Sequence, residues 1–493
     1  MTVPFSNIPS NLRVPLFYAE VDNSQANSGA QTQRTLIVGQ ITASGNGLPG
    51  VPVLGQGVSD AQAKGGLGSM LALMTAAYKN SDSFGEVWFL PLADASGAVS
   101  ATGTVAIVGT PTATGVISLY IGGQLISLTV TTGELAADIA TALAALVNGS
   151  GDLLPVTATA ATSTVTLTAK NGGTGGNEID LRLNYLGTAG GESTPAGLTL
   201  TLTQMAGGAT NPVLDAALST LGDEAFDIIV SPYTDTASLN SLKNLLNDKT
   251  GRWSYASQLY GHVFAAQRGT LSTLSTAGNA RNNQHESIMG FYDSPSPAWI
   301  WAADLAGTAA VALRADPGRP LQTLALSTVL APPPASRFDL GERNTLLWDG
   351  ISTFTVASDG TVAIENLITT YQVNGFGSPD DSYLQVETLF SLMYVLRFLR
   401  SIVTSKYGRV KLAANGTRFA PGSAIVTPNI IRADLIAGYG TLEYNGFAQD
   451  TKAFAQALIV EKNATNPNRV DVLWPGTLMN QLRTFALLAQ FRL

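Results

Sequence analysis

Residues 35–41 have the sequence TLIVGQI, and residues 86–90 have the sequence EVWFL. Both runs have the length and the apolar character of buried β-strands. Between them lie a Gly/Pro-rich loop at 45–57 and then residues 59–80, whose apolar side chains recur at helical spacing. A strand, a crossover helix and a second strand form the βαβ unit of a parallel sheet. These segments therefore predict an α/β fold.

The same alternation resumes after residue 211. Apolar runs predict three further strands, at 226–231, 260–266 and 287–292. Helical spacing predicts the helices that alternate with them, at 212–221, 235–247, 270–280 and 299–315. We therefore expect one discontinuous α/β core made of residues 34–96 and 209–375.

Residues 97–208, which separate the two halves of this core, have a different composition. They contain 21 Thr and only eight charged residues, and several of their segments alternate with period two. The sequence YIGGQ at 120–124 predicts a hairpin turn. Residues 134–147 predict a helix with Thr132 in its N-cap region. We expect an inserted, mostly β domain that buries its own core.

The character of the chain changes again after residue 372. The sequence SPDD at 378–381 predicts the cap of a long helix that ends near residue 406. The later segments predict a further helix end and two strands. We expect an α+β C-terminal domain at 376–480.

The two ends of the chain are apolar but lack a steady period. Pro4, Pro9 and Pro15 favour an extended backbone at the start. The apolar residues of the predicted N-terminal arm, 1–33, are Val3, Phe5, Ile8, Leu12, Val14, Leu16, Phe17 and Tyr18. Those of the predicted C-terminal arm, 481–493, are Leu482, Phe485, Leu487, Leu488, Phe491 and Leu493. Such side chains need a surface that covers them, either on the chain's own domains or on a neighbouring subunit.

The composition limits the possible partners. Only 13% of the 493 residues are charged, about half the usual share, which indicates that much of the surface is covered in a larger assembly. The net charge of −8 lacks the basic footprint that general nucleic-acid binding requires. The absence of Cys excludes disulfides and thiolate sites. The sequence predicts neither a secretory signal peptide nor a membrane helix.

Candidate catalytic groups are few. His262 lies in an apolar run and is expected to be structural, whereas His285 has polar neighbours and is expected at the surface. The segment 45–50 has dinucleotide-binding spacing, but no helix follows it directly. The segment 65–69 lies within the predicted helix, which favours close helix packing over phosphate binding. We therefore expect no catalytic residue, cofactor or metal.

Positive charge is concentrated late in the chain. Residues 376–493 carry 12 basic and eight acidic residues, whereas residues 1–375 carry 15 and 27. No acidic residue lies between Glu387 and Asp434. The basic residues there that end the predicted helix or follow it are Arg397, Arg400, Lys406, Arg409 and Lys411. They either favour the helix C-terminus through its dipole or form a basic face for an acidic partner.

Four segments in this order resemble the contractile tail sheath proteins of Mu-like phages. They are PFSNIPSNLRVPLFYAEVDNSQA at 4–26, GLGSMLALMTAAY at 66–78 followed by EVWFLPL, the pair ISLYIGGQLISLTV and TLTAKNGGTGGNEIDL, and NRVDVLWPGTLMNQLRTFALLAQFRL at 468–493. The resemblance spans most of the chain.

The resemblance implies a subtilisin-like, non-catalytic core, an outward-pointing inserted domain and a tube-facing C-terminal domain. It implies a structural subunit that forms stacked hexameric rings around the tail tube and contracts to drive the tube through the host envelope. The implied partners are further copies of the chain, the tube protein, and baseplate and terminator proteins. The implied location is the virion, after assembly in the host cytoplasm. The arms would add strands to neighbouring subunits, and the five basic residues would face the tube. Because residues 97–208 have alternating strands and a helix of their own, we also expect them to be dispensable for the lattice.

Two other classes of protein remain as alternatives. One is another phage or surface structural protein with an immunoglobulin-like module, and the other is an α/β hydrolase-type enzyme. Deleting residues 482–493 is expected to leave the thermal transition of the core unchanged if that arm docks on a neighbour.

Overall fold

The computed structural model describes residues 33–492, which form two compact units. The larger unit contains Gln33–Ser391 together with the chain from Asn480 onward, and the smaller unit contains Leu392–Met479. The apolar residues of the predicted N-terminal arm lie outside the described residues, and so does Leu493.

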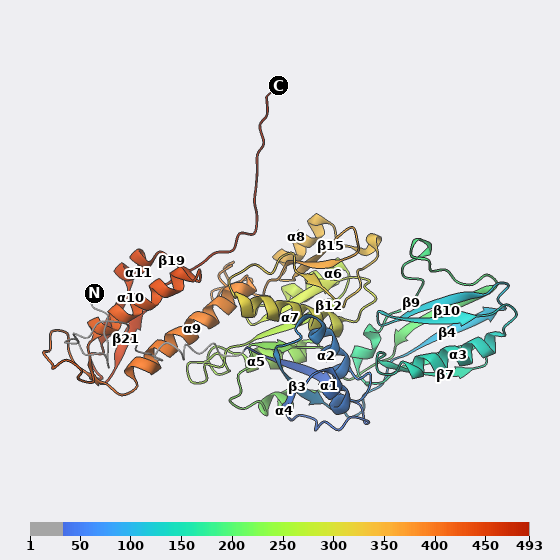
Figure 1. The fold of residues 1–493 in the computed structure, drawn as a ribbon, viewed down its shortest axis with the longest axis horizontal. Helices are drawn as coiled ribbons and strands as arrows, with labels where there is room; N and C mark the ends of the chain where they lie inside the picture. The colour runs from blue at the N-terminus through green and yellow to red at the C-terminus, as the bar shows by residue number, and fades with distance from the viewer. Residues whose placement is uncertain (1–32, 493) are drawn as a thin grey trace, which may run out of the picture. The chain divides into compact units, whose positions relative to one another are not determined.

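A six-stranded sheet with the order β13-β12-β11-β1-β3-β2 forms the core of the larger unit (Figure 1). Neighbouring strands pair in parallel, except that the edge strand β2 is antiparallel to β3. The strands are β1 Arg34–Gln40, β2 Val53–Gly55, β3 Glu86–Leu92, β11 Ile228–Val230, β12 His262–Arg268 and β13 Glu286–Phe291. The predicted α/β alternation is confirmed.

Strand β1 is the point at which the two halves of this unit meet. Thr35 on β1 pairs with Val87 on one side and with Ile228 on the other. The strand that precedes residues 97–208 and the first sheet strand that follows them therefore flank the same central strand.

Helices α1 (Val58–Gly65), α2 (Met70–Ser81) and α7 (Ala298–Ala315) accompany these strands. α2 packs closely on α7, since a Cβ atom at Gly307 would lie 2.5 Å from the carbonyl oxygen of Tyr78. The prediction of one helix over 59–80 is wrong. Gly66 and Gly68 have φ of +86° and +69°, which ends α1 before α2 begins. The segment 65–69 is therefore a break between two helices.

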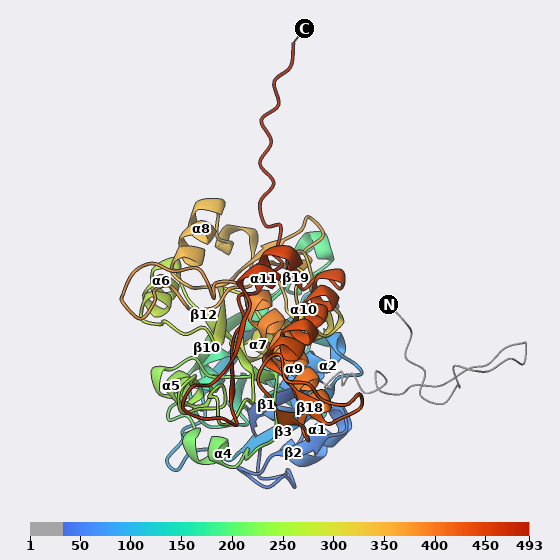
Figure 2. The same ribbon diagram turned by 90° about the vertical axis from the view of Figure 1, so that its left-hand side faces the viewer.

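A second helical layer contains α5 (Thr236–Leu245), α6 (Leu271–Asn279) and α8 (Leu340–Trp348). Leu239, Leu274 and Leu346 from these helices form one apolar cluster with sheet residues Ala265 and Ile288. Figure 2 shows α5 and α6 on one side of the central strands and α2 on the other. The core of the larger unit also contains the short helix α4 (Asp215–Ser219) and a small three-stranded sheet. That sheet consists of β14 Ala325–Leu326, β16 Val362–Asn366 and β15 Thr353–Val356.

Residues 97–208, here called the insert, form two antiparallel sheets and the helix α3 (Ala136–Gly149). One sheet has the order β10-β4-β8-β7, with strands Leu198–Ala206, Thr102–Gly109, Thr164–Ala169 and Val156–Ala161. The other has the order β6-β5-β9, with strands Gln124–Val130, Gly115–Ile121 and Leu181–Leu183. The predicted hairpin is confirmed at Gly122 and Gly123, whose φ are +58° and +85°. The predicted cap is not, because Leu135 is the N-cap residue of α3.

The smaller unit is built on the part of α9 (Val386–Tyr407) from Leu392 onward, on α10 (Pro428–Tyr444) and on α11 (Thr451–Ala457). Its strand pairs are β17 Lys411–Leu412 with β18 Ile425–Val426, β19 Ala448–Gln449 with β22 Thr477–Leu478, and β20 Ile459–Lys462 with β21 Val470–Leu473. Tyr439 stacks on Phe454 with ring centroids 3.8 Å apart. The segment 378–381 does not cap α9, which begins at Val386; Asp380 instead accepts a hydrogen bond from the Tyr371 hydroxyl.

Candidate interaction surfaces

The five basic residues do not form one face. Arg397 and Arg400 are three residues apart on α9 and share a side of the helix, whereas Lys406, nine residues after Arg397, lies about 180° away by helical geometry. Arg409 and Lys411 follow the end of the helix and are exposed. The structure thus brings together only part of the predicted set.

Lys406 has a partner within its own unit. Its Nζ lies 2.9 Å from a carboxylate oxygen of Asp434 on α10, and the Tyr407 hydroxyl donates to the same carboxylate. Burial and this contact raise the pKa of Tyr407 above its ordinary range. Lys406 therefore ties the end of α9 to α10, a role that the gap between Glu387 and Asp434 in the sequence did not suggest.

The described apolar side chains of the predicted C-terminal arm are exposed to solvent. Residues 479–492 have no regular secondary structure, and Figure 2 shows the end of the chain as an extended trace. Leu482 is 70% exposed, and the exposed fractions rise to 83% for Leu488 and 84% for Phe491. Phe485 and Leu487 are similarly open. These side chains are thus not buried on the described part of their own subunit.

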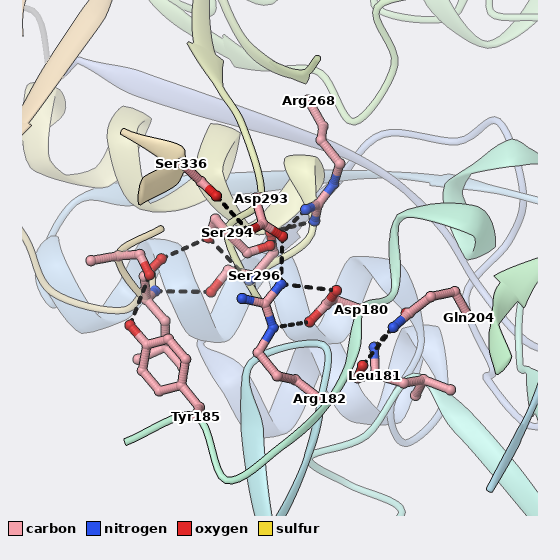
Figure 3. Close-up of polar contacts among 12 residues, drawn as sticks. Asp180, Leu181, Arg182, Tyr185, Gln204, Arg268, Asp293, Ser294, Ser296 and Ser336 are labelled. Atoms are coloured by element: carbon pink, nitrogen blue, oxygen red, sulfur yellow. Dashed lines mark hydrogen bonds and ion pairs between the residues drawn. The ribbon is translucent and has the colours of Figure 1, made fainter. Parts of the chain in front are cut away.

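A polar network that the sequence did not predict joins the insert to the core (Figure 3). Arg182 lies on β9 of the insert and donates to Asp180 beside it. It also donates to Asp293, which follows β13, at 2.7 Å. Arg268, at the end of β12, donates in the reverse direction to Glu178 of the insert at 2.9 Å. Ser336 donates to the second oxygen of Asp293.

The electrostatics of the two carboxylates differ. Burial raises the pKa of Asp180 above its ordinary value in spite of Arg182. Burial also acts to raise the pKa of Asp293, but hydrogen bonds from Ser336 and Arg182 outweigh it and lower this pKa. Asp293 is therefore the carboxylate whose charge the network stabilises.

A second set of contacts joins residues 171–172 of the insert to the core. The Gln40 side chain, at the end of β1, donates to the Gly172 carbonyl at 2.6 Å and to Asp94. Asp94 accepts from the Gly172 amide, and Asn171 donates to the Ile41 carbonyl at 3.0 Å. Residues 171–172 and 178–182 of the insert are thus fastened to the core near the ends of strands β1, β12 and β13.

The two histidines are buried. His262 bonds to Ser287 at 2.9 Å, and both side chains are 0% exposed, so a substrate has no access to this pair. Burial lowers the pKa of His262 well below its ordinary value. The expectation that His285 lies at the surface is wrong: it is 3% exposed, stacks on Trp253 and bonds to Asp248. Its polar neighbours in the sequence were a misleading signal, because they face Asp248 and the core.

Within 33–492, no group of three or more His, Asp or Glu side chains is placed to hold a metal ion. Over the same span, no helix has both the length and the hydropathy to cross a bilayer.

Comparison with known families gives two matches along the chain. The family described as phage tail sheath protein central domain matches residues 207–370. The family described as phage tail sheath C-terminal domain matches residues 378–492. These spans cover the second half of the core and the smaller unit.

Among individual proteins, the chain is 43% identical over 493 residues to the Mu-like prophage FluMu tail sheath protein of Haemophilus influenzae, with all of both chains covered. The structure of the present chain is similar to that of the sheath tail protein of Listeria innocua, with 14% identity, a TM-score of 0.48 and coverage of 92% and 94% of the two chains. It is also similar to the helical sheath of the anti-feeding prophage in the contracted state, with 12% identity, a TM-score of 0.48 and coverage of 98% and 99%.

Proposed function

The chain belongs to the family of Mu-like phage tail sheath proteins, and from that premise we propose that it polymerises as stacked hexameric rings around a tail tube. Contraction of this sheath drives the tube through the host cell envelope. The subunit is assembled in the host cytoplasm and becomes part of the virion. Its partners are further copies of itself, the tube protein, and the baseplate and terminator proteins.

The exposed C-terminal arm is the observation that carries this proposal. Burying an apolar side chain that is left in water would stabilise the protein by about 1.5–3 kcal/mol. An arm with four side chains between 77% and 84% exposed therefore favours docking on another molecule. In a homopolymer, that molecule is a second copy of the chain.

The smaller unit offers an acceptor for such an arm. Strands β20 and β21 form a two-stranded sheet, and Ile459, Val472 and Leu473 on it are 44–59% exposed. An extended peptide adds to an open edge through main-chain hydrogen bonds, and its side chains set the register. The arm of a neighbouring copy, and the N-terminal arm with Val3 to Tyr18, complete this sheet in our proposal.

The smaller unit faces the tube, and its exposed cations contact acidic groups there. Arg400, Arg409 and Lys411 are exposed, and ion pairs at such positions are worth about 0–1 kcal/mol each. Contacts of this size hold a subunit in register and break again when it moves.

The insert points outward and moves with the core. The ion pairs of Arg182 and Arg268 and the contacts of Gln40 join the two parts at separate places. Subunits that rotate as near-rigid bodies, while the arms keep them linked, give the coordinated shortening that contraction requires.

Negative-stain electron microscopy of the purified protein tests the proposal. Hollow tubes or rings are expected, and they should incorporate added tube protein in their lumen. A protein that remains monomeric at concentrations where tube protein is present in excess would contradict the proposal.

A further inference from the structure

Glu387 is a fully buried carboxylate that contacts the root of the C-terminal arm. It lies in the first turn of α9, where the helix dipole favours a negative charge, and its side chain is 0% exposed. One carboxylate oxygen accepts from the Leu321 amide at 2.7 Å. The other accepts from the guanidinium of Arg483 at 2.6 Å. A buried charge of this kind is stable only when it is paired.

Arg483 is held by more than this ion pair. Its second terminal nitrogen lies 3.4 Å from the side-chain oxygen of Gln322, and the amide nitrogen of Gln322 lies 3.5 Å from the Leu482 carbonyl. The side chain of Arg483 is only 17% exposed. These contacts come from two segments of the larger unit, the loop at 321–322 and the start of α9, and they converge on two adjacent residues of the arm, Leu482 and Arg483.

The contacts end abruptly after Arg483. Among the described residues, 484–492 make no side-chain hydrogen bond or ion pair, and Phe485 is already 79% exposed. The chain therefore changes from fixed to free within two residues. The free part among the described residues, 484–492, reaches about 30 Å when extended.

We propose that Arg483 is the positioning residue of the C-terminal arm: its ion pair with Glu387 fixes the point on the larger unit from which the arm leaves toward a second copy of the chain. This inference rests on the proposed function, since the arm is taken to be the link between subunits. The ion pair directs the arm before assembly and afterwards transmits the pull of the neighbour to α9 and to the loop at Leu321. Without it, the arm would begin at β22, which pairs with β19 through two residues only.

The test measures, in the free subunit, the distance between the loop that carries Arg319 and the arm residue that follows Arg483. Because the chain has no Cys, spin labels can be placed at Arg319→Cys and Thr484→Cys alone, both at exposed positions. A pulsed electron-spin distance measurement is expected to give a narrow distribution for the labelled protein. Arg483→Met should lose the narrow component, and Arg483→Lys, which keeps the charge but not the planar fork, should retain part of it. Arg492→Met, the same change at an exposed position of the same arm, should leave the distribution as it was.

Amide hydrogen exchange provides a second readout. The Leu321 amide donates to Glu387, so Arg483→Met should speed its exchange by about tenfold or more, whereas Arg492→Met should not. A narrow distribution in Arg483→Met, with unchanged exchange, would overturn the proposal. So would a broad distribution in the parent labelled protein, which decides the matter even if the Met variant does not fold.

Assembly separates this inference from the proposed function. If the labelled parent has a narrow distribution but never forms rings or tubes, the proposed function fails and the anchor stands. If it forms tubes while the free subunit has a broad distribution, the anchor alone fails. If both hold, Arg483→Met should form fewer or shorter tubes than Arg492→Met at equal concentration.

Discussion

Arg182 of the insert and Asp293 of the core form an ion pair of 2.7 Å across 111 residues of sequence. The guanidinium also contacts Asp180, so one cation serves a carboxylate from each part of the larger unit (Figure 3). This arrangement makes the attachment of the insert a matter of electrostatics as well as of chain connectivity.

Replacing Arg182 with Met should destabilise the larger unit by about 2 kcal/mol, because the mostly buried Asp180 (14% exposed) and the partly exposed Asp293 (36% exposed) both lose their cation. Urea unfolding monitored by tryptophan fluorescence measures the change. Arg469→Met is the matched control, since that side chain is 63% exposed beside Asp471 and its loss should cost less than about 0.5 kcal/mol. Equal effects of the two variants would contradict the role assigned to Arg182.

The lowered pKa of Asp293 predicts a pH dependence with a definite sign. A carboxyl whose pKa is lower in the folded than in the unfolded chain adds stability above its unfolded value, and this is lost as the pH falls through the folded value. Asp180, whose pKa is raised, acts with the opposite sign. Asp293→Asn should therefore flatten the loss of stability below about pH 4 and leave the slope above about pH 5 unchanged. Urea midpoints measured below about pH 4 and above about pH 5 test this, and a steeper acid limb in the variant would refute it.

Two truncations of the C-terminal arm should behave differently. A chain ending at Arg483 should keep the unfolding transition of the larger unit and lose the ability to form tubes. A chain ending at Gln481 should also unfold more readily, by about 3 kcal/mol, because Glu387 stays buried without its cation. The expectation from the sequence that deletion of 482–493 leaves the core unchanged is revised accordingly. Calorimetry with electron microscopy on both chains makes the comparison, and identical melting temperatures would contradict it.

Reversing the charge of Arg400 and Arg409 together should impair assembly around the tube while leaving polymers without tube possible. Both side chains are exposed, so the double change to Glu should alter the stability of the subunit by less than about 1 kcal/mol. Co-sedimentation with tube protein measures the loss. Lys452→Glu, also at an exposed position of the smaller unit but outside the five basic residues, serves as the control. Normal assembly of the double variant around tubes would remove these residues from the tube surface.

Replacing residues 97–208 with a short Gly/Ser linker should leave a folded protein that still polymerises, since the insert has sheets and a helix of its own. Its stability should fall by about 1–3 kcal/mol, because Gln40 and Arg268 lose partners and Trp299, now 3% exposed, loses its cover. Urea midpoints and microscopy measure the two outcomes. A folded monomer that forms no tubes would show that the insert carries essential contacts of the lattice.

Much of the fold could be predicted because strands and helices have patterns of apolar and capping residues within a short stretch of the sequence. The run TLIVGQI is buried along nearly all of β1, and Asp235 and Thr270 cap α5 and α6 where the helical pattern begins. The apolar spacing does not indicate the break between α1 and α2, because it continues across the break. Gly66 has positive φ there, and the folded chain leaves no room for a side chain, since a Cβ would lie 2.0 Å from the Thr42 hydroxyl. His285 was misplaced for a similar reason, since Trp253 and Asp248 approach it only in the folded chain.

The sequence by itself determined the α/β alternation, the Thr-rich insert and the apolar C-terminal arm, because periodicity and composition act over a few residues. Only the tertiary structure decided which charges meet. Lys406 forms an ion pair with Asp434, Arg182 with Asp293, and Arg483 with Glu387, which lies 96 residues away in the sequence. A charged side chain has no periodic signature that names its partner, because the partner is selected by the packing of distant segments and by the cost of burying either charge alone.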